Sequence, residues 1–473
     1  MSKRVRIPTG ELAMLLRGWP RSGVSLVDSL TVSLRDLIAS GDLISGGQLP
    51  SERSLASALN ISRTTVTRSF ERLDAEGWLD REQGSGTWIK STLQARANPL
   101  GVRLRGFEET DSDGSIDFTS AASVGLPLVA EAWARLSAGS SMTHLVATHG
   151  YSPRGLPDLV EGICHYYWAG GIDTVHEQVL VTNGSQHATT LIASMLISPG
   201  DVVVVEEPTY RGAIDVFRAA GARLVSVTSD EEGINVGELS NALRSHNVTF
   251  VYVLPTIHNP TGSALVSSRR QRFIDTVVRH GMLVVEDASP IDTYFGETPL
   301  RPLAADLPIE LVVTFGSATK LFWGGLRVGW IRATRERIDR LMKVRSGGDI
   351  GGSLPSQALV AALMPDVRRA RELRRNHLHA SYVHLTSLLQ EELPEWAWWP
   401  VAGGGSLWVT LPNASALPLA ASAAHLGVRF TPGPTFSAFG RQQDRIRLPF
   451  ANSSADRTEG VRRLAQAWST LKP

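Results

Sequence analysis

The sequence predicts an α/β protein with a helical appendage at its N-terminus. From Ile116 onward, short valine-rich runs without strict alternation are separated by helical stretches, a pattern typical of strands buried on both faces of a mostly parallel sheet. Before Lys90, short amphipathic helical segments dominate instead. Residues 91–115 have little periodicity and favour a linker. We therefore expect a small domain at 23–90, a linker at 91–115 and a large domain at 116–473.

Composition narrows the class of protein. The chain has 473 residues and a formal net charge of +1, so its length allows several domains while its overall charge does not indicate a polyanionic partner. Cys164 is the single cysteine, which excludes an internal disulfide framework and fits a reducing compartment. No apolar stretch approaches the roughly 18 residues of a membrane span, and the basic N-terminus lacks a signal-peptide core. We expect a soluble, cytoplasmic protein with no membrane partner.

The N-terminal zone has the element order of a winged helix-turn-helix. Leucine or isoleucine recurs every four residues from Leu26 to Ile38, which predicts a helix with one buried stripe. Ser51 and Ser62 are expected to cap two further helices, separated by a short turn at Asn60. Two short strands around "GSG" then form a hairpin.

The third helix suits contact with a major groove. Its first turn carries compact polar side chains, which face away from its apolar stripe and can meet phosphates or base edges: Arg63, Thr64, Thr65 and Thr67. The alternative is an ordinary three-helix accessory domain with a solvated polar face. Charge does not decide between the two, because residues 1–90 contain twelve Lys and Arg against ten Asp and Glu.

The large zone contains a lysine in apolar surroundings. Lys320 lies in "TFGSATKLFWGGLRVGW". Because desolvation lowers the pKa of a buried ammonium, such an amine becomes nucleophilic and forms Schiff bases with carbonyl compounds, notably pyridoxal phosphate. That cofactor also needs a phosphate cup, an acid at the pyridine nitrogen, a donor to the ring oxygen and a stacking face.

The sequence offers each of these parts at the carboxyl end of a predicted strand, where open α/β sheets bind ligands. They are the helix start at Gly184 and Ser185 with Ser317 and Arg327 for the phosphate, Tyr210 for stacking, Asn259 for the ring oxygen and Asp287 for the pyridine nitrogen. Taken singly, each pattern is ordinary: a surface lysine, a turn, a solvated acid or a helix cap. Their occurrence together and in this order favours a cofactor site. No metal site is predicted.

Two stretches resemble known families. The segment "LPSERSLASALNISRTTVTRSFERLDAEGWLDREQGSGTWI" is similar to the winged helix of GntR-type transcription regulators. This resemblance implies that a set of residues from the second helix, the recognition helix and the wing contacts double-stranded DNA: Arg53, Arg63, Thr64, Thr65, Thr67, Gln83, Gly84, Ser85 and Gly86.

Residues 116–473 resemble the fold-type I, aspartate aminotransferase-like transferases through "NPTG", "SATKLFWGGLRVGW" and "RIRLPFA". The resemblance implies large and small subdomains and assigns Lys320 as the Schiff-base lysine, Asp287 as the pyridine partner and Asn259 as the ring-oxygen donor. It further implies phosphate ligands at Ser185, Gln186, Ser317 and Arg327, a stacking ring at Tyr210, a carboxylate-binding Arg447, and a Tyr151 that reaches the phosphate of a neighbouring subunit. Ser289 stands where such proteins commonly carry a tyrosine, which removes a second contact to the ring oxygen.

The combination resembles the MocR subfamily of bacterial regulators. This implies a homodimer that binds an operator with repeated half-sites and senses pyridoxal phosphate itself, or a small amino acid or amine, at the cofactor. Two alternatives stay open: a genuine aminotransferase with an incidental winged helix, and a nucleic-acid-binding protein with an empty, vestigial site. The sequence does not name the effector, the operator, the target genes or the direction of regulation.

Overall fold

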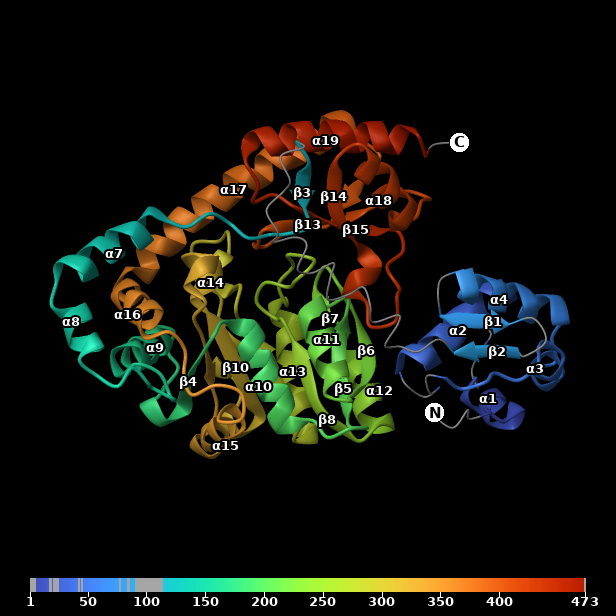
Figure 1. Cartoon of the computed structure of the whole chain (residues 1–473), viewed down its shortest axis with the longest axis horizontal. Coiled ribbons are helices and arrows are strands. Elements are labelled where there is room, and N and C mark those ends of the chain that lie inside the picture. Colours follow the sequence, from blue (N-terminus) through green and yellow to red (C-terminus); the bar gives the residue numbers. More distant parts are fainter. Residues whose placement is uncertain are drawn as a thin grey trace. The chain divides into compact units, whose positions relative to one another are not determined.

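The computed structural model describes residues 6–16, 19, 25–40, 43, 46–75, 78–82, 86–89 and 114–471. The chain divides into two compact units, Met1–Glu108 and Glu109–Pro473 (Figure 1). The predicted linker lies outside the described residues except for its last two positions, Gly114 and Ser115. Gln83, Gly84 and Ser85, predicted to contact DNA, also lie outside them.

The N-terminal unit has the predicted helices and hairpin, preceded by one further helix. Its elements are α1 (Thr9–Leu15), α2 (Leu26–Ser40), α3 (Glu52–Leu59), α4 (Arg63–Ala75), β1 (Leu79–Glu82) and β2 (Gly86–Ile89), with β1 and β2 antiparallel. Both predicted caps are present, because Ser51 Oγ accepts the N–H of Ser54 and Ser62 Oγ accepts the N–H of Thr65, each at 3.1 Å. These caps satisfy N–H groups that the first helical turn leaves without partners.

A single core holds this unit together. Leu30 and Leu34 of α2 pack with Val66 and Phe70 of α4, and all four are fully buried. Leu26, the first residue of the predicted stripe, is 43% exposed, so the buried stripe begins one turn later. The regular four-residue spacing predicts which residues share one face of α2, but not which of them are covered by the rest of the unit.

The second unit has a large subdomain built on an eight-stranded sheet. Its strands are β4 (Val179–Thr182), β5 (Val202–Glu207), β6 (Arg223–Asp230), β7 (Gly233–Ile234), β8 (Val248–Val253), β9 (Val284–Asp287), β10 (Val312–Ser317) and β11 (Gly329–Arg332). The strand order is β4-β11-β10-β9-β8-β5-β6-β7. The five central strands β10, β9, β8, β5 and β6 pair in parallel, while β11 is antiparallel to both neighbours and β7 is antiparallel to β6. The predicted mostly parallel sheet is confirmed.

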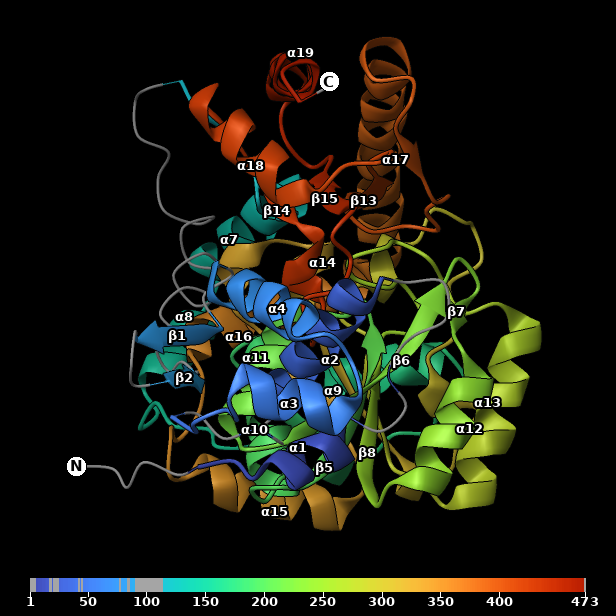
Figure 2. The ribbon, with the colours of Figure 1, turned by 90° about the vertical axis from the view of Figure 1, so that its right-hand side faces the viewer.

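The sheet and some helices of the large subdomain form a valine-rich core. The helices of this subdomain are α7 (Pro127–Ala138), α8 (Ser141–Val146), α9 (Pro157–Ala169), α10 (Ser185–Leu196), α11 (Arg211–Ala219), α12 (Val236–Ser245), α13 (Ser267–His280), α14 (Ala318–Leu321), α15 (Arg335–Arg345) and α16 (Leu354–Leu363). Short 3-10 turns occur at His176–Gln178, Ile291–Thr293, Leu303–Ala305, Ile309–Leu311, Gly324–Leu326, Met364–Asp366 and Gly433–Phe436. Helices α12 and α13 lie side by side (Figure 2).

The small subdomain has a separate sheet and core. Its strands are β3 (Ile116–Phe118), β12 (Ala397–Trp398), β13 (Ser406–Thr410), β14 (Val428–Pro432) and β15 (Arg445–Pro449), in the order β12-β13-β15-β14-β3. Helices α18 (Ala416–His425) and α19 (Ser454–Ser469) complete it, and α17 (Val367–Glu392) extends from the large subdomain to a position beside α19 (Figure 1). No helix in the described part of the chain is long and apolar enough to cross a membrane.

Candidate functional site

Five of the residues predicted for the cofactor site line one cavity of about 110 Å³. The cavity lies where strands of the large sheet end, and its wall is completed by residues of the small subdomain such as Ser406. Residues far apart in the sequence meet there because parallel strands end at the same edge of the sheet. The five are Ser185, Tyr210, Asn259, Asp287 and Lys320.

Lys320 faces this cavity from α14, directly after strand β10. Burial lowers the pKa of its ammonium to about 8, the nearby positive charge of Arg447 acts in the same direction, and Asp287 opposes them. Arg374 holds the lysine helix in place, because it donates to the carbonyl oxygens of Leu321 and Phe322, both at 2.9 Å. An amine with this pKa is partly unprotonated near neutral pH and can act as a nucleophile.

Asp287 ends strand β9 and is only 4% exposed. Its Oδ1 accepts the backbone N–H of Ser289 at 2.9 Å, and its Oδ2 accepts the hydroxyl of Tyr252 at 3.0 Å. Burial raises the pKa of this carboxyl, while the two hydrogen-bond donors and Lys320 lower it. Each oxygen keeps a lone pair free for a further donor, as a pyridinium nitrogen would supply.

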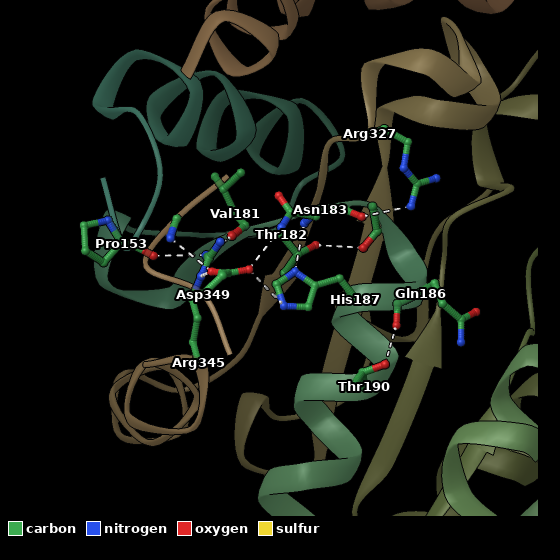
Figure 3. A network of polar contacts seen from close by, with 12 residues as sticks. Pro153, Val181, Thr182, Asn183, Gln186, His187, Thr190, Arg327, Arg345 and Asp349 are labelled. Carbon is green, nitrogen blue, oxygen red and sulfur yellow. Dashed lines mark hydrogen bonds and ion pairs between the residues drawn. The ribbon is translucent and has the colours of Figure 1, made fainter. Parts of the chain in front are cut away.

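The predicted phosphate cup is the start of α10. Gly184 has a φ of 84°, a conformation that L side chains rarely adopt, and the helix begins at the next residue. Arg327 lies over this turn and donates from Nη2 to the carbonyl oxygen of Asn183 at 3.2 Å (Figure 3). The free N–H groups of the helix start and the guanidinium together suit an anion.

Tyr210 and Gln186 support each other beside the cup. The Tyr210 hydroxyl donates to Gln186 Oε1 at 3.0 Å, and Gln186 Nε2 donates to the carbonyl oxygen of Gly212 at 3.1 Å. A Cβ at Gly212 would lie 2.5 Å from Gln186 Oε1. The close approach of the Tyr210 ring therefore depends on a glycine at this position.

Five predicted residues do not line the cavity: Gln186, Arg327, Arg447, Ser317 and Tyr151. The hydroxyl of Ser317 caps α14 by accepting the N–H of Thr319 at 3.1 Å, and it donates to the carbonyl oxygen of Val328 at 3.2 Å. Tyr151 does not line the cavity of its own chain and is 58% exposed. The assignment of Ser317 and Tyr151 as phosphate ligands stays a prediction.

Arg447 reaches the site from β15 and is 6% exposed. Its Nη1 donates to Asn259 Oδ1 at 3.4 Å, its Nη2 donates to the carbonyl oxygen of Thr119 at 2.5 Å, and its guanidinium stacks on Phe436 at 5.0 Å. Burial lowers its pKa to about 9, and the positive charge of Arg211 adds to this. Among the described residues its buried Nε has no hydrogen-bond partner, so the guanidinium keeps an unused donor.

The donor set of this cavity fits pyridoxal phosphate. A primary amine, a carboxylate, an amide and an aromatic ring border one space, and a helix start with a guanidinium borders its edge: Lys320, Asp287, Asn259, Tyr210 and Arg327. When bound, this cofactor supplies an aldehyde that condenses with amines and a ring that accepts electrons. The residues can hold the ring, its nitrogen, its ring oxygen and its phosphate at one time.

Several residues of the site escaped the sequence analysis. Tyr252 lies within the strand run "TFVYVLP" and contacts Asp287 only because β8 and β9 are neighbours in the sheet. His258 lines the cavity, and burial lowers its pKa to about 4, so its ring is neutral near pH 7. Arg374 lies in the middle of α17 among other arginines. Spacing along the sequence carries no signal for Tyr252 or Arg374, whereas His258 directly precedes the "NPTG" turn.

Three of the predicted DNA-contacting residues, Arg53, Arg63 and Gly86, border a groove of about 1120 Å³ in the N-terminal unit. The side chain of Arg63 is 70% exposed, and its Nε lies 3.6 Å from Glu52 Oε2. Glu52 also accepts the hydroxyl of Thr67 at 2.7 Å and Nη2 of Arg81 at 2.6 Å. Basic and acidic side chains line the groove: Arg6, Arg53, Arg63, Arg81, Glu52 and Asp74.

Thr64 is exposed and Thr65 half-buried on the first turn of α4, and contact of both residues with DNA stays a prediction. Gly86 begins strand β2 with a φ of 115°, and a Cβ there would lie 2.4 Å from Gln48 Nε2. A side chain at this point of the wing would therefore force Gln48 away.

Comparisons with known proteins match both units. Residues 26–89 match the family of bacterial regulatory proteins of the gntR type, and residues 123–464 match the aminotransferase class I and II family. The 2-aminoadipate transaminase of Thermus thermophilus is 32% identical over 351 residues, which cover 72% of this chain and 86% of that protein. The HTH-type transcriptional regulator YisV of Bacillus subtilis (strain 168) is 26% identical, with 84% and 87% covered.

Two further similar proteins are a regulator and an aminotransferase of known structure. The probable rhizopine catabolism regulatory protein MocR of Rhizobium meliloti is 28% identical, with 77% of each chain covered. The crystal structure of LysN, an α-aminoadipate aminotransferase from Thermus thermophilus complexed with N-(5'-phosphopyridoxyl)-L-leucine, superposes with a TM-score of 0.71 at 30% identity, over 80% of this chain and 99% of that one. The chain belongs to the class I and II aminotransferase family and joins that fold to a GntR-type DNA-binding domain, the architecture of the MocR-like transcription regulators.

Proposed function

We propose that this protein is a transcription regulator that holds pyridoxal phosphate through Lys320 and changes its operator binding when the cofactor or an amino acid or amine occupies the site. The observation that supports this most strongly is the presence, in one chain, of a GntR-type DNA-binding domain and a cavity with the full donor set for the cofactor. A regulator needs both parts, whereas an enzyme needs only the second.

Arg447 and Lys320 suggest how an effector is recognised. The amine of an amino acid would compete with Lys320 for the cofactor, while its carboxylate would bind the guanidinium of Arg447, which lies beside the cavity residue Asn259. Binding at both ends changes contacts of the large and the small subdomain together. It therefore supplies a free-energy difference between domain arrangements, without which no ligand can shift a conformational equilibrium.

The position of Tyr151 supports assembly into a homodimer. This side chain is exposed and lies away from the cavity of its own chain, and Trp133 and Val146 of the nearby helices α7 and α8 are 55% and 77% exposed. Pairing of two large subdomains would bury such apolar surface and bring each Tyr151 to the neighbour's phosphate. Two winged helices would then address repeated half-sites of double-stranded DNA, which implies a cytoplasmic location in a bacterium.

The test measures DNA affinity against occupancy of the site. A DNA duplex selected from a random-sequence pool by the full chain serves as the operator. We expect its dissociation constant or footprint to change when pyridoxal phosphate, and then each protein amino acid or simple alkylamine, is added. Lys320→Ala should abolish the response while the circular dichroism spectrum stays unchanged. Arg447→Ala should remove the response to amino acids but keep cofactor binding. If Arg447→Ala responds normally, the effector is the cofactor itself or an amine without a carboxylate.

A catalytic aminotransferase is the second candidate, because Lys320, Asp287 and Arg447 are all in place and a relative is named as a 2-aminoadipate transaminase. Sustained turnover of amino acids with 2-oxoglutarate would support it, whereas a single spectral change without turnover supports the regulator. A protein that takes up no pyridoxal phosphate, and so shows no absorption band near the visible edge, contradicts both functions.

A further inference from the structure

Asn183 connects the phosphate loop to the rest of the large subdomain through three different groups. Its carbonyl oxygen accepts Nη2 of Arg327 at 3.2 Å, and its backbone N–H donates to Nδ1 of His187 at 3.0 Å. Its side-chain Nδ2 donates to Oδ2 of Asp349 at 3.0 Å (Figure 3). Asp349 therefore holds the residue on which Arg327 rests.

Asp349 is itself fixed in position. Its Oδ1 accepts Nε of Arg345 and the backbone N–H of Gly351, the latter at 3.0 Å. His187 Nε2 lies 3.5 Å from Asp349 Oδ2. Because His187 Nδ1 accepts the Asn183 N–H, the neutral ring carries its proton on Nε2, toward the carboxylate. Arg345 is 2% exposed, so its side chain is held in place by the residues around it.

The same network reaches the segment that carries Tyr151. Nη1 of Arg345 donates to the carbonyl oxygen of Pro153 at 3.0 Å and to that of Val181 (Figure 3). Gly155, with a φ of 123°, lies against strand β4 so closely that a Cβ would be 2.3 Å from Val181 Cγ2. A Cβ at Gly351 would lie 2.9 Å from the carbonyl oxygen of Ser152. Segment 151–155 is therefore packed against the loop that holds Asp349.

We propose that Asp349, held by Arg345, is a positioning residue that joins the phosphate loop to segment 151–155, so that cofactor binding and the pairing of two copies strengthen each other. The inference rests on the proposed function, in which the loop binds the phosphate and Tyr151 reaches the partner's phosphate. When the phosphate binds, it fixes the phosphate loop, and through Asp349 it also fixes segment 151–155 in the position that the partner contacts. In the reverse direction, pairing fixes segment 151–155 and thereby the phosphate loop. Such coupling is reciprocal by thermodynamic necessity.

Asp349→Asn tests the link because it keeps the size of the side chain. The amide can still accept from Arg345 through its oxygen, but its NH₂ group would then face the Nδ2 donor of Asn183. We expect the dissociation constant for pyridoxal phosphate, measured by absorbance titration, to rise on the order of tenfold. We also expect the cofactor to strengthen the dimer less than in the natural protein, as measured by analytical ultracentrifugation with and without the cofactor.

Asp339→Asn is the matched control. It removes another ion pair between the same region and segment 151–155, that of Asp339 with Arg154 at 3.2 Å, but it touches no residue of the phosphate loop. Its cofactor affinity should equal that of the natural protein. If Asp349→Asn does not fold, Asn183→Ser removes the same contact from the other side and should produce the same two losses.

The outcomes separate the two proposals. If the natural protein binds no pyridoxal phosphate, the proposed function fails, and this inference fails with it. If the natural protein binds the cofactor and pairs, but Asp349→Asn keeps the full effect of the cofactor on pairing, the coupling through Asp349 is wrong and the proposed function stands. Equal losses in Asp349→Asn and Asp339→Asn would also overturn it, because any ion pair to segment 151–155 would then suffice.

Discussion

The buried charge of Lys320 lowers the stability of the ligand-free protein, which indicates that the site is arranged for a ligand. Arg447 and Arg374 both act against its positive charge, and Asp287 is the acidic group that acts in its favour. Burial of a charged group without a close partner destabilises a fold unless the group loses its charge. The ligand-free protein therefore carries an unfavourable ammonium, which the proposed covalent bond to the cofactor would remove.

We predict that Lys320→Met stabilises the cofactor-free protein. The pKa of Lys320 is lowered from 10.5 to about 8, so between these values the folded state binds fewer protons than the unfolded state and stability rises with pH. The penalty is complete below pH 8 and vanishes as the pH approaches 10.5. Because the ammonium faces a cavity, we expect a gain of about 1–3 kcal/mol in the free energy of unfolding at pH 7. Chemical denaturation at pH 7 and at about pH 9.5 measures it.

The exposed Lys343 of α15 provides the control. Its ammonium lies in water in the folded protein, so Lys343→Met should not stabilise the protein at pH 7. A Lys320→Met protein that is less stable than the natural one at pH 7 would show that the lysine contributes packing or hydrogen bonds that outweigh the cost of its charge.

At the scale of single elements, the sequence predicted structure that depends on a few neighbouring residues. It did not predict contacts between segments that are distant along the chain. The strands β4, β5, β8, β9 and β10 were predicted, because valine-rich runs mark strands buried on both faces. The antiparallel insertion of β11 between β4 and β10 and the pairing of β3 with β14 were not, since such pairings depend on the whole topology. Asn183 and Asp349 are likewise far apart along the chain, so the sequence did not predict their contact.

For the candidate site, the sequence predicted which residues lie near strand ends, but not where every side chain points. The cavity unites Lys320, Asp287 and Asn259 because each follows a strand of one sheet, a relation that element order alone predicts. The direction of a side chain is a different matter. Ser317 is the last residue of the buried strand β10, yet its hydroxyl turns to Thr319 and Val328. No sequence pattern determines which of these neighbours a serine rotamer selects.

Helix α4 carries the prediction that belongs to this scale. Arg63 is largely exposed in the groove of the N-terminal unit and only loosely paired with Glu52 at 3.6 Å. If it reads a base edge, Arg63→Ala should weaken operator binding by roughly 1–3 kcal/mol and relax specificity at one base pair. Fluorescence anisotropy with single-base operator variants measures both effects.

Arg68 is the matched control on the same helix, since it is exposed and does not line the groove. Arg68→Ala should leave the sequence preference unchanged. If Arg63→Ala instead weakens all sequences equally and makes the salt dependence shallower, Arg63 contacts phosphate and not a base.

At the scale of the whole molecule, separate hydrophobic cores support two tasks. In the described part of the chain, the DNA-binding unit, the large subdomain and the small subdomain each have a core of their own. The cavity has walls from both subdomains, so its occupancy can alter how they meet. In a dimer the site would also include the partner's Tyr151, which makes ligand, subdomain contact and pairing parts of one equilibrium.

A mixing experiment tests whether each site is shared between two copies. Tyr151→Ala should weaken cofactor binding by a factor of roughly 10 to 100, since a hydrogen bond to a charged group contributes about 1.5–3 kcal/mol. Lys320→Ala should lose covalent binding altogether. In a heterodimer of these two variants, one site would contain both defects, while the other would combine the natural Lys320 of one copy with the natural Tyr151 of the other. Mixed dimers should therefore regain one tight, covalent site for each pair, detected as absorbance at half the stoichiometry of the natural protein. If each copy built its site alone, every site in the mixture would keep its own defect, and no tight binding would return.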